Sequence, residues 1–417
     1  MGARSRARNH RDGREEAPSN RRKSLGKVKL SFGILIFVAA ILIVVMIHES
    51  GHFLVAKLFG FKAPQFFIGF GPTIWSFKRG ETEYGIKAIP AGGFVKIVGM
   101  NPYEDVPPED RPRAYPSKPR WQRALLLVAG SATHFLVAFL ILIGTLLSIG
   151  WPTGRPDNKV AGIQDNTPAA AAGLQPGDEI LSVDGAETDT WNEVRSFIQD
   201  HPGEQVTFAV NRDGERLEVE AEIGRALFNE NGELVKSEST GETLRDPKPG
   251  ERVAGFMGVL PDTVYRQYGF FGAIGKAGSL TGEITVASVK GIPKVFEPVF
   301  NGELWSALSG EGERDANSPI GLVGASRIAG QSVESERYWD LIMLIVFFTI
   351  FVGILNLLPL PPLDGGHLAV LAWEAITGKA VDIRKLIPVA AVVISFFVLL
   401  FIAVLYLDIA RPVELPF

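Results

Sequence analysis

Four long stretches of the chain carry no Asp, Glu, Lys or Arg, and they restrict the fold more than any other feature of the sequence. They cover residues 30–47, 124–154, 341–363 and 386–407. A helix needs about 20 residues to cross the hydrocarbon core of a bilayer. Because 21% of the residues are nevertheless charged, apolar and polar segments must be segregated along the chain. The pattern predicts a membrane protein with four transmembrane helices.

The boundaries of these helices follow from the flanking residues. We expect the first helix at residues 30–56, because an amphipathic pattern continues beyond Ile47, and the others at residues 124–154, 339–363 and 386–407. Residues 1–29 are Arg-rich and lack an apolar period, which is typical of a disordered basic tail.

The two long polar segments differ in charge, and this difference predicts the orientation. Residues 57–123 hold 11 Lys and Arg, whereas residues 155–340 hold 17 Lys and Arg against 31 Asp and Glu. Positive residues in short loops favour the cytoplasmic side. We therefore place residues 57–123 inside the cell and the acidic block outside. The basic tail conflicts with this orientation, and the sequence leaves the conflict open.

Short alternating runs separated by Gly and Pro, as between Gly69 and Phe94, predict β-hairpin structure in residues 57–123. In the outer block, residues 166–223 predict a short helix, a glycine turn, a strand, a second helix and two further strands. This string resembles a PDZ domain of the bacterial type, which implies an extracytoplasmic α+β domain at residues 155–262. Residues 263–338 mix Gly and apolar residues with few charges, which predicts helices at the membrane surface.

PDZ domains bind an extended chain end by strand addition. The resemblance implies that Val160–Ile163 would be the matching strand and loop, and that peptide or protein tails bind at the groove. The groove could instead serve only as a steric filter.

The first apolar run ends in His48-Glu49-Ser50-Gly51-His52. Residues four apart share one face of a helix, so the two histidines can bind one metal while Glu49 reaches its bound water. An ionisable group near the bilayer centre costs about 2.5–3.5 kcal/mol, which a bound cation would offset. The chain has no cysteine, so any transition metal must be held by His, Asp or Glu.

A hydrolytic zinc needs a third protein ligand. Residues 356–367 interrupt the third apolar run with three prolines and two glycines and then present Asp364. Irregular backbone at membrane depth must face protein or a water-filled cavity, so we expect Asp364 to face the first span. His367 competes as the third ligand, and His134 in the second span either hydrogen-bonds between helices or binds the metal.

The two motifs together resemble the site-2 protease family of intramembrane zinc metalloproteases, in its bacterial regulated-proteolysis branch with a PDZ domain. The resemblance spans roughly Lys29 to Leu407 and rests on His48, Glu49, His52, Asn356, Pro359, Pro361, Leu363, Asp364 and Gly365. It implies that His48, His52 and Asp364 bind zinc and that Glu49 is the catalytic base. The implied substrate-binding residues are Asn356 and, in a loop similar to the family's membrane-associated β-hairpin, Gly69, Gly71, Gly92, Gly93 and Phe94.

The resemblance further implies cleavage of single-span membrane proteins, such as anti-sigma factors and remnant signal peptides. This would be regulated intramembrane proteolysis, in the stress response of a bacterium, by a multi-pass protein of the plasma membrane. The edge of the hairpin would pair with an unwound substrate helix, and we expect no nucleic-acid partner. Two other classes stay open: a non-catalytic PDZ receptor for membrane-protein tails, and a metal transporter, which would need polar ligands along several spans.

Overall fold

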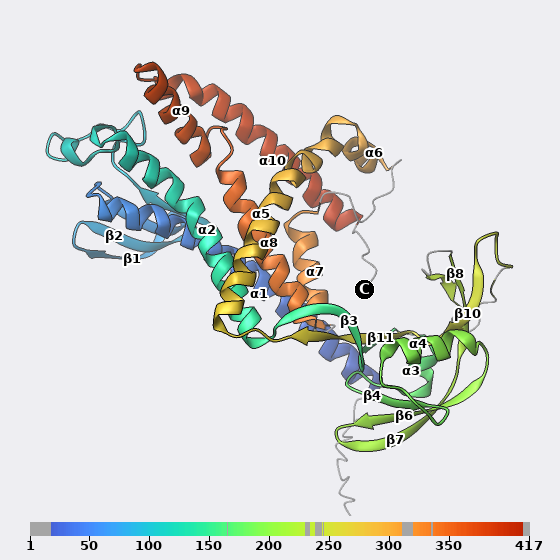
Figure 1. Cartoon of the computed structure of the whole chain (residues 1–417). Helices are drawn as coiled ribbons and strands as arrows, with labels where there is room; N and C mark the ends of the chain where they lie inside the picture. Colours follow the sequence, from blue (N-terminus) through green and yellow to red (C-terminus); the bar gives the residue numbers. More distant parts are fainter. Residues whose placement is uncertain are drawn as a thin grey trace, which may run out of the picture. The chain divides into compact units, whose positions relative to one another are not determined.

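The computed structural model describes residues 18–164, 166–229, 234–237, 244, 246–310, 320–334 and 337–411. The chain divides into two compact units. Met1–Ile141 and Gly278–Phe417 form the first unit, and Leu142–Ala277 form the second. Helices dominate the first unit and strands the second (Figure 1).

The α-helices outside residues 149–269 carry most of each apolar stretch of the sequence. They are α1 (Pro18–Leu58), α2 (Arg120–Ser148), α5 (Phe270–Phe300), α6 (Glu303–Ser309), α7 (Leu322–Glu334), α8 (Tyr338–Asn356), α9 (Asp364–Thr377) and α10 (Ile387–Ala410), with 3-10 turns at Arg111–Arg113, Tyr115–Ser117 and Ile383–Leu386. Among the described residues, four helical segments are long and apolar enough to span a membrane: Ser31–Leu58, Arg120–Ser148, Tyr338–Asn356 and Ile383–Ala410. This agrees with the predicted multi-span fold.

The helix ends differ from the predicted ones for local reasons. The third span ends at Asn356 instead of residue 363, because the following prolines lack the N–H group that a helix needs. The second span ends at Ser148 instead of residue 154, because Gly150, two residues after Ser148, adopts a positive φ of 96° that interrupts the helix. At the N-terminal side, α1 already begins at Pro18, so residues 18–29 are helical rather than disordered. The remainder of the predicted tail, residues 1–17, lies outside the described residues.

Close packing between α1 and α7 depends on a glycine. A Cβ atom on Gly33 would lie 2.7 Å from the carbonyl oxygen of Ala329 and from the Cα of Gly330. Next to this contact, Phe37 is fully buried in a cluster with Ala329 and Val333. Small residues that let helix backbones approach closely are typical of packing within membranes. Helix α7 belongs to the region expected at the membrane surface, residues 263–338, and that placement stays a prediction.

A small antiparallel sheet follows α1 and consists of β1 (Gln65–Arg79) and β2 (Thr82–Lys96). Both strands fold back on themselves, so that residues 65–68 pair with residues 83–86 on one side and with residues 93–96 on the other. Residues 93–96 are therefore an edge of this sheet among the described residues. The hairpin predicted for this loop is present, whereas its association with a membrane stays a prediction.

Glu81, in the turn between β1 and β2, ties the hairpin to the end of α1. Its carboxylate accepts hydrogen bonds from Arg113 at 2.6 and 2.8 Å and from Lys57 at 2.8 Å. The bonds from Arg113 and, second, those from Lys57 lower the pKa of Glu81 to about 2. This clamp fixes the start of the loop on the helix that carries the two motif histidines.

The second unit is an α+β structure. Its main sheet has the strand order β11-β3-β4-β6-β7, with β5 paired to β4. The elements are β3 (Trp151–Ile163), α3 (Pro168–Ala172), β4 (Glu179–Val183), β5 (Ala186–Glu187), α4 (Trp191–Asp200), β6 (Gln205–Arg212), β7 (Glu215–Glu222) and β11 (Val259–Arg266). A second sheet, of order β10-β8-β9, consists of β8 (Gly224–Phe228), β9 (Leu234–Ser237) and β10 (Arg252–Phe256).

The core of the main sheet is apolar, and one buried ion pair fixes the turn before β4. Val183 and Phe208 are almost completely buried in this core. Asp178 is fully buried, and its carboxylate accepts two hydrogen bonds of 2.7 Å from Arg212 and one from the backbone N–H of Gln175. A buried carboxylate is stable only when it is paired in this way.

Candidate metal centre

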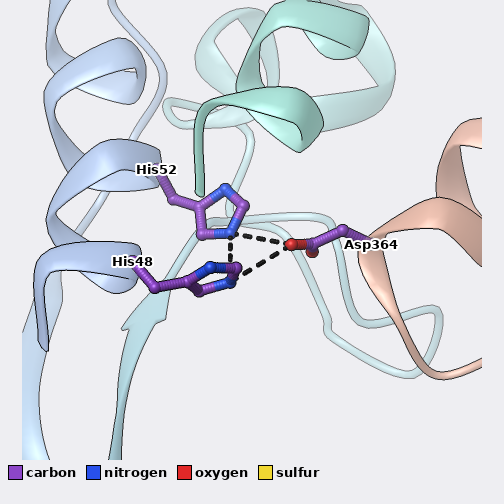
Figure 2. A group of neighbouring side chains, drawn as sticks. All are labelled: His48, His52 and Asp364. Carbon is purple, nitrogen blue, oxygen red and sulfur yellow. Dashed lines mark hydrogen bonds and ion pairs between the residues drawn. The ribbon is translucent and has the colours of Figure 1, made fainter. Parts of the chain in front are cut away.

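Two histidines of α1 and one aspartate at the start of α9 meet inside the first unit (Figure 2). The Nε2 atoms of His48 and His52 are 3.2 Å apart. Asp364 Oδ2 lies 3.2 Å from Nε2 of His48 and 3.1 Å from Nε2 of His52. Residues four apart on α1 thus point at one carboxylate that is more than 300 positions away in sequence.

The turn between α8 and α9 delivers Asp364 to this point. It contains three prolines, and α9 starts at Asp364 itself. A Cβ atom on Gly365 would lie 2.2 Å from the carbonyl oxygen of Leu357, and one on Gly366 would lie 2.7 Å from the carbonyl carbon of Leu360. Only glycine fits at these two positions, because the chain folds back directly onto the end of α8.

The spacing of the three atoms fits a tetrahedral metal ion. With metal–ligand bonds of about 2.0–2.1 Å, neighbouring ligand atoms of such a site are about 3.3–3.4 Å apart. The observed separations of 3.1–3.2 Å are close to this value. Nitrogen and carboxylate oxygen donors are also the ligands that zinc accepts when no cysteine is present.

Helix α2 fixes the orientation of both imidazoles. Nδ1 of His52 lies 2.7 Å from the carbonyl oxygen of Leu126. Since a carbonyl can only accept, Nδ1 carries the proton, and Nε2 of the neutral ring presents a lone pair to Asp364. Nδ1 of His48 lies 3.0 Å from Nε2 of His134. A neutral His52 turns its Nε2 lone pair toward Asp364 Oδ2 at 3.1 Å, an arrangement that a bound cation stabilises.

Glycines let α2 approach the site. A Cβ atom on Gly130 would lie 2.3 Å from Nε2 of His52 and 2.7 Å from Cε1 of His48. On the other helix, a Cβ atom on Gly51 would lie 2.5 Å from the carbonyl oxygen of Ala129. The imidazoles therefore occupy the space that a side chain at position 130 would fill.

Glu49 is held by the edge of the small sheet. The backbone N–H of Val95 donates a hydrogen bond of 3.0 Å to Glu49 Oε2. The neighbouring Gly93 is close as well, because a Cβ atom there would lie 3.5 Å from Glu49 Cγ and 3.0 Å from Met46 Sδ. The edge strand and the carboxylate thus meet directly beside the two histidines of α1.

Comparison with known proteins identifies the family. The sequence profile described as peptidase family M50 matches residues 36–402, which include most of each span, the small sheet and the three converging residues. The chain belongs to peptidase family M50. The predicted resemblance to site-2 proteases is thereby confirmed.

Relatives support the same assignment for this M50 chain. It is 32% identical to the zinc metalloprotease Rip1 of Mycobacterium tuberculosis, over 92% of this chain and 98% of the relative. A putative zinc metalloprotease of Brucella suis is 33% identical over 86% and 90%, and the regulator of sigma-W protease RasP of Bacillus subtilis is 26% identical over 91% and 98%. The predicted class, a zinc metalloprotease in a bacterial membrane with several spans, is confirmed.

The predicted M50 site residues separate into those that meet and those that do not. His48, His52 and Asp364 form the only group of three or more His, Asp or Glu residues within metal-binding distance among the described residues. His367, the competing third ligand, is not part of that group. It lines a separate apolar cavity of about 290 Å³ with Tyr103 and Leu386.

The predicted substrate-binding residues are more dispersed. Gly93 faces Glu49 at the edge of the sheet, and Phe94 stacks on Phe67 with the ring planes 10° apart. Gly69 and Gly71, both with positive φ, lie where β1 bends past Ile89. Gly92 also has a positive φ, and Asn356 is the half-buried last residue of α8.

Sequence reasoning missed three groups that shape the site: the N–H of Val95, the carbonyl of Leu126 and Gly130. The first two are backbone groups, which no residue pattern reveals. Gly130 carries a weak signal, because it lies four residues before His134 and so shares a helix face with it.

Proposed function

We propose that this zinc metalloprotease hydrolyses peptide bonds within the transmembrane segments of single-span membrane proteins, with zinc bound by His48, His52 and Asp364. One observation carries the proposal: the three ligand atoms lie 3.1–3.2 Å from one another, and two of them belong to an apolar helix that is long enough to span a membrane. A hydrolytic centre placed within a membrane span acts on substrates that are themselves in the membrane.

The chemistry requires an acid–base group beside the metal. When bound, zinc supplies the Lewis acid that polarises the scissile carbonyl and lets water attack near neutral pH. Glu49 would accept a proton from the attacking water at a carboxylate oxygen and pass it to the nitrogen of the leaving amine. The hydrogen bond from Val95 restrains this carboxylate next to the imidazoles.

The edge at residues 93–96 would hold the substrate. In an antiparallel ladder, successive residues turn their backbone groups alternately toward and away from the partner strand. Because the N–H of Val95 points to Glu49, away from its partner Phe66, the backbone groups of Gly93 point outward as well. An unwound substrate segment could pair there by strand addition, which would replace the hydrogen bonds lost from its helix.

We assign the remaining predicted residues to the surroundings of this edge. Gly92 and Phe94 flank Gly93, Gly69 and Gly71 shape the bend of β1, and Asn356 would contact the substrate strand from the end of α8. The supporting observation is geometric for Gly93, and the other five rest on the family resemblance.

The name of the Bacillus subtilis relative, regulator of sigma-W protease, supports a role in regulated intramembrane proteolysis. We propose anti-sigma factors and remnant signal peptides as substrates, in a bacterial stress response. In the orientation that the loop charges predict, the loop at residues 57–123 faces the cytoplasm and the acidic block at residues 155–340 lies outside. The alternative of a non-catalytic receptor is not favoured, because the chain belongs to a family of peptidases.

Replacing the proposed base tests the function. Purified Glu49→Gln should cut a model transmembrane substrate at least about 10²-fold more slowly than the parent, because the proton acceptor is lost. Its zinc content should stay unchanged, since Glu49 is not among the three converging residues. Glu109→Gln, at an exposed position in the loop, is the matched control. Cleavage by Glu49→Gln at the parental rate would refute the mechanism.

A groove in the second unit supports a second function, the binding of protein tails by a PDZ-type domain. A cavity of about 330 Å³ lies between α4 and the segment that links β10 to β11, and Ile198, Gly258 and Val259 line it. The N–H groups of Met257 and Gly258 have no acceptor among the described residues, so they could receive a terminal carboxylate.

The location of this groove differs from the predicted one. Val160–Ile163 pair with β11, and Val160 also exchanges hydrogen bonds with Gly177 and Asp178, so this segment lies inside the sheet. Strand β11 lies at the edge of the sheet order and borders the cavity. A bound tail would therefore extend β11.

Peptide binding in the presence of a chelator tests this second function apart from catalysis. A fluorescent peptide with an apolar last residue should bind the Glu49→Gln protein at least about tenfold more tightly with a free carboxylate than as the amide. Equal affinity of the two peptides would contradict the groove assignment.

A further inference from the structure

We propose that His134 is a positioning residue of the metal centre: it accepts a hydrogen bond from His48 and thereby keeps the opposite nitrogen of His48 free to bind the cation. The inference rests on the ligand set proposed above. It assigns His134 neither to the ligands nor to the groups that touch the substrate.

The position of His134 supports this role. Its Nε2 lies 3.0 Å from Nδ1 of His48, with ring centroids 5.0 Å apart. The other nitrogen of His48, Nε2, faces Asp364 and His52. His134 thus contacts the ring on the side opposite to the ligand cluster, and it is not part of the metal-binding group.

Packing holds His134 in this place. Only 1% of its surface is exposed. A Cβ atom on Gly353 of α8 would lie 2.8 Å from Cβ of His134, so the backbone of α8 closes the space behind the ring. The side chain is therefore confined between α8 and His48, which favours a fixed hydrogen bond over a mobile one.

The two ligand histidines are oriented in parallel ways by the same helix. His52 donates from Nδ1 to the carbonyl of Leu126, and His48 has Nδ1 against His134. Outer partners of this kind fix the tautomer of a metal-binding histidine, and their loss typically weakens metal binding about 10–100-fold. The difference is that a carbonyl can only accept, whereas an imidazole nitrogen can also donate.

This difference makes the proton arrangement of the pair decisive. If His134 donated from Nε2, the proton of a neutral His48 would lie on its Nε2 and block metal binding. In the productive arrangement His48 donates, and His134 carries its own proton on Nδ1. That atom is buried and has no hydrogen-bond partner among the described residues. The cost of this unsatisfied N–H is offset when the cation binds Nε2 of His48.

Two substitutions separate positioning from simple packing. Gln places an amide oxygen near the site of Nε2 and can accept from His48, whereas Leu fills similar volume and cannot accept. Zinc affinity should be measured by competition with a chelator on purified full-length protein. His134→Leu should bind zinc about 10–100-fold more weakly, and His134→Gln should stay within about threefold of the parent.

A second measurement does not depend on the variants. In the zinc-loaded parent with ¹⁵N-labelled histidine, Nδ1 of His134 should carry the proton and Nε2 should not. A proton on Nε2, parental zinc affinity of His134→Leu, or equal losses in the Gln and Leu variants would each overturn the proposal. Asp364→Ala distinguishes a failure of the proposed ligand set from a failure of the role of His134. If Asp364→Ala loses zinc while His134→Leu does not, the ligand set stands and only the role of His134 fails.

Discussion

The helices around the metal centre and the sheet unit at residues 142–277 differ most in the side chains that they expose. In the helices, His48, Ser131 and His134 are buried, whereas Leu399 and Ile402 are exposed. In the sheet unit, Val183 and Phe208 are buried, and strand β7 turns its glutamates outward. The first pattern suits a lipid environment and the second suits water.

Close backbone approach at glycines occurs in both regions, since a Cβ atom on Gly255 of β10 would lie 1.7 Å from the carbonyl oxygen of Ile198. Sheet strands interlock large apolar side chains over a core such as that around Phe208. The helices meet at Gly33, Gly51, Gly130 and Gly353, where an added Cβ would lie within 2.8 Å of a neighbouring atom. In lipid, apolar side chains gain little by leaving the solvent, so backbone approach and polar contacts stabilise the bundle. Polar side chains can therefore be accommodated inside the bundle, as they are at the metal centre.

The largest effect should come from filling the space at Gly130. In Gly130→Ala the new methyl group would lie 2.3 Å from Nε2 of His52, so both imidazoles must move. The loss of zinc affinity should exceed the 10–100-fold that is typical of losing an outer hydrogen bond. Zinc content after dialysis and cleavage rate measure the effect.

Gly144→Ala is the matched control on the same helix, because a Cβ there meets no atom within 4 Å. This variant should retain zinc and activity, and its helix should gain slightly from the better helix propensity of alanine. If both variants behaved alike, close approach at Gly130 would not be what holds the two imidazoles in place.

The sequence predicted the spans because their apolar runs are long. It predicted His48, His52 and Asp364 as metal ligands because such residue types are unusual in or beside apolar runs. It could not predict which face of α2 meets α1. Residues 124–148 hold one ionisable side chain, His134, and their other polar residues are Ser and Thr, so no charged face marks the exposed side of this helix. The roles of Gly130 and His134 could therefore be assigned only from the three-dimensional structure.

In the sheet unit, alternating polarity gave the strands and their burial, as in β7. It did not give the strand order. The composition of Val160–Ile163 fits an edge strand as well as an interior strand. Only its pairing with β11, almost 100 residues later in the chain, shows that β11 is the edge strand. Long-range pairing is set by the whole sheet and leaves little trace in a local pattern.

A pair of phenylalanines tests the comparison directly and should give a smaller effect. Phe208 in the sheet unit and Phe37 in the bundle are both at most 1% exposed. Phe208→Ala should destabilise its unit by about 3–5 kcal/mol, because it loses burial from water and leaves a cavity. Phe37→Ala should cost roughly half as much, since mainly packing contacts are lost in lipid. Segment-resolved hydrogen exchange in nanodiscs reports each unit separately, and equal costs would contradict the contrast.

The smallest effect should come from the exposed end of the first unit, where Glu81 joins Arg113 and Lys57. Glu81→Gln should cost about 1 kcal/mol at pH 7, because the pairs are partly exposed to solvent. The pKa of Glu81 is lowered from 4.5 to about 2, so its stabilisation is complete above pH 4.5 and is lost as the pH falls toward 2. The difference in melting temperature between parent and variant should therefore shrink over this interval. A difference that stays constant down to pH 2 would show that Glu81 acts through packing rather than charge.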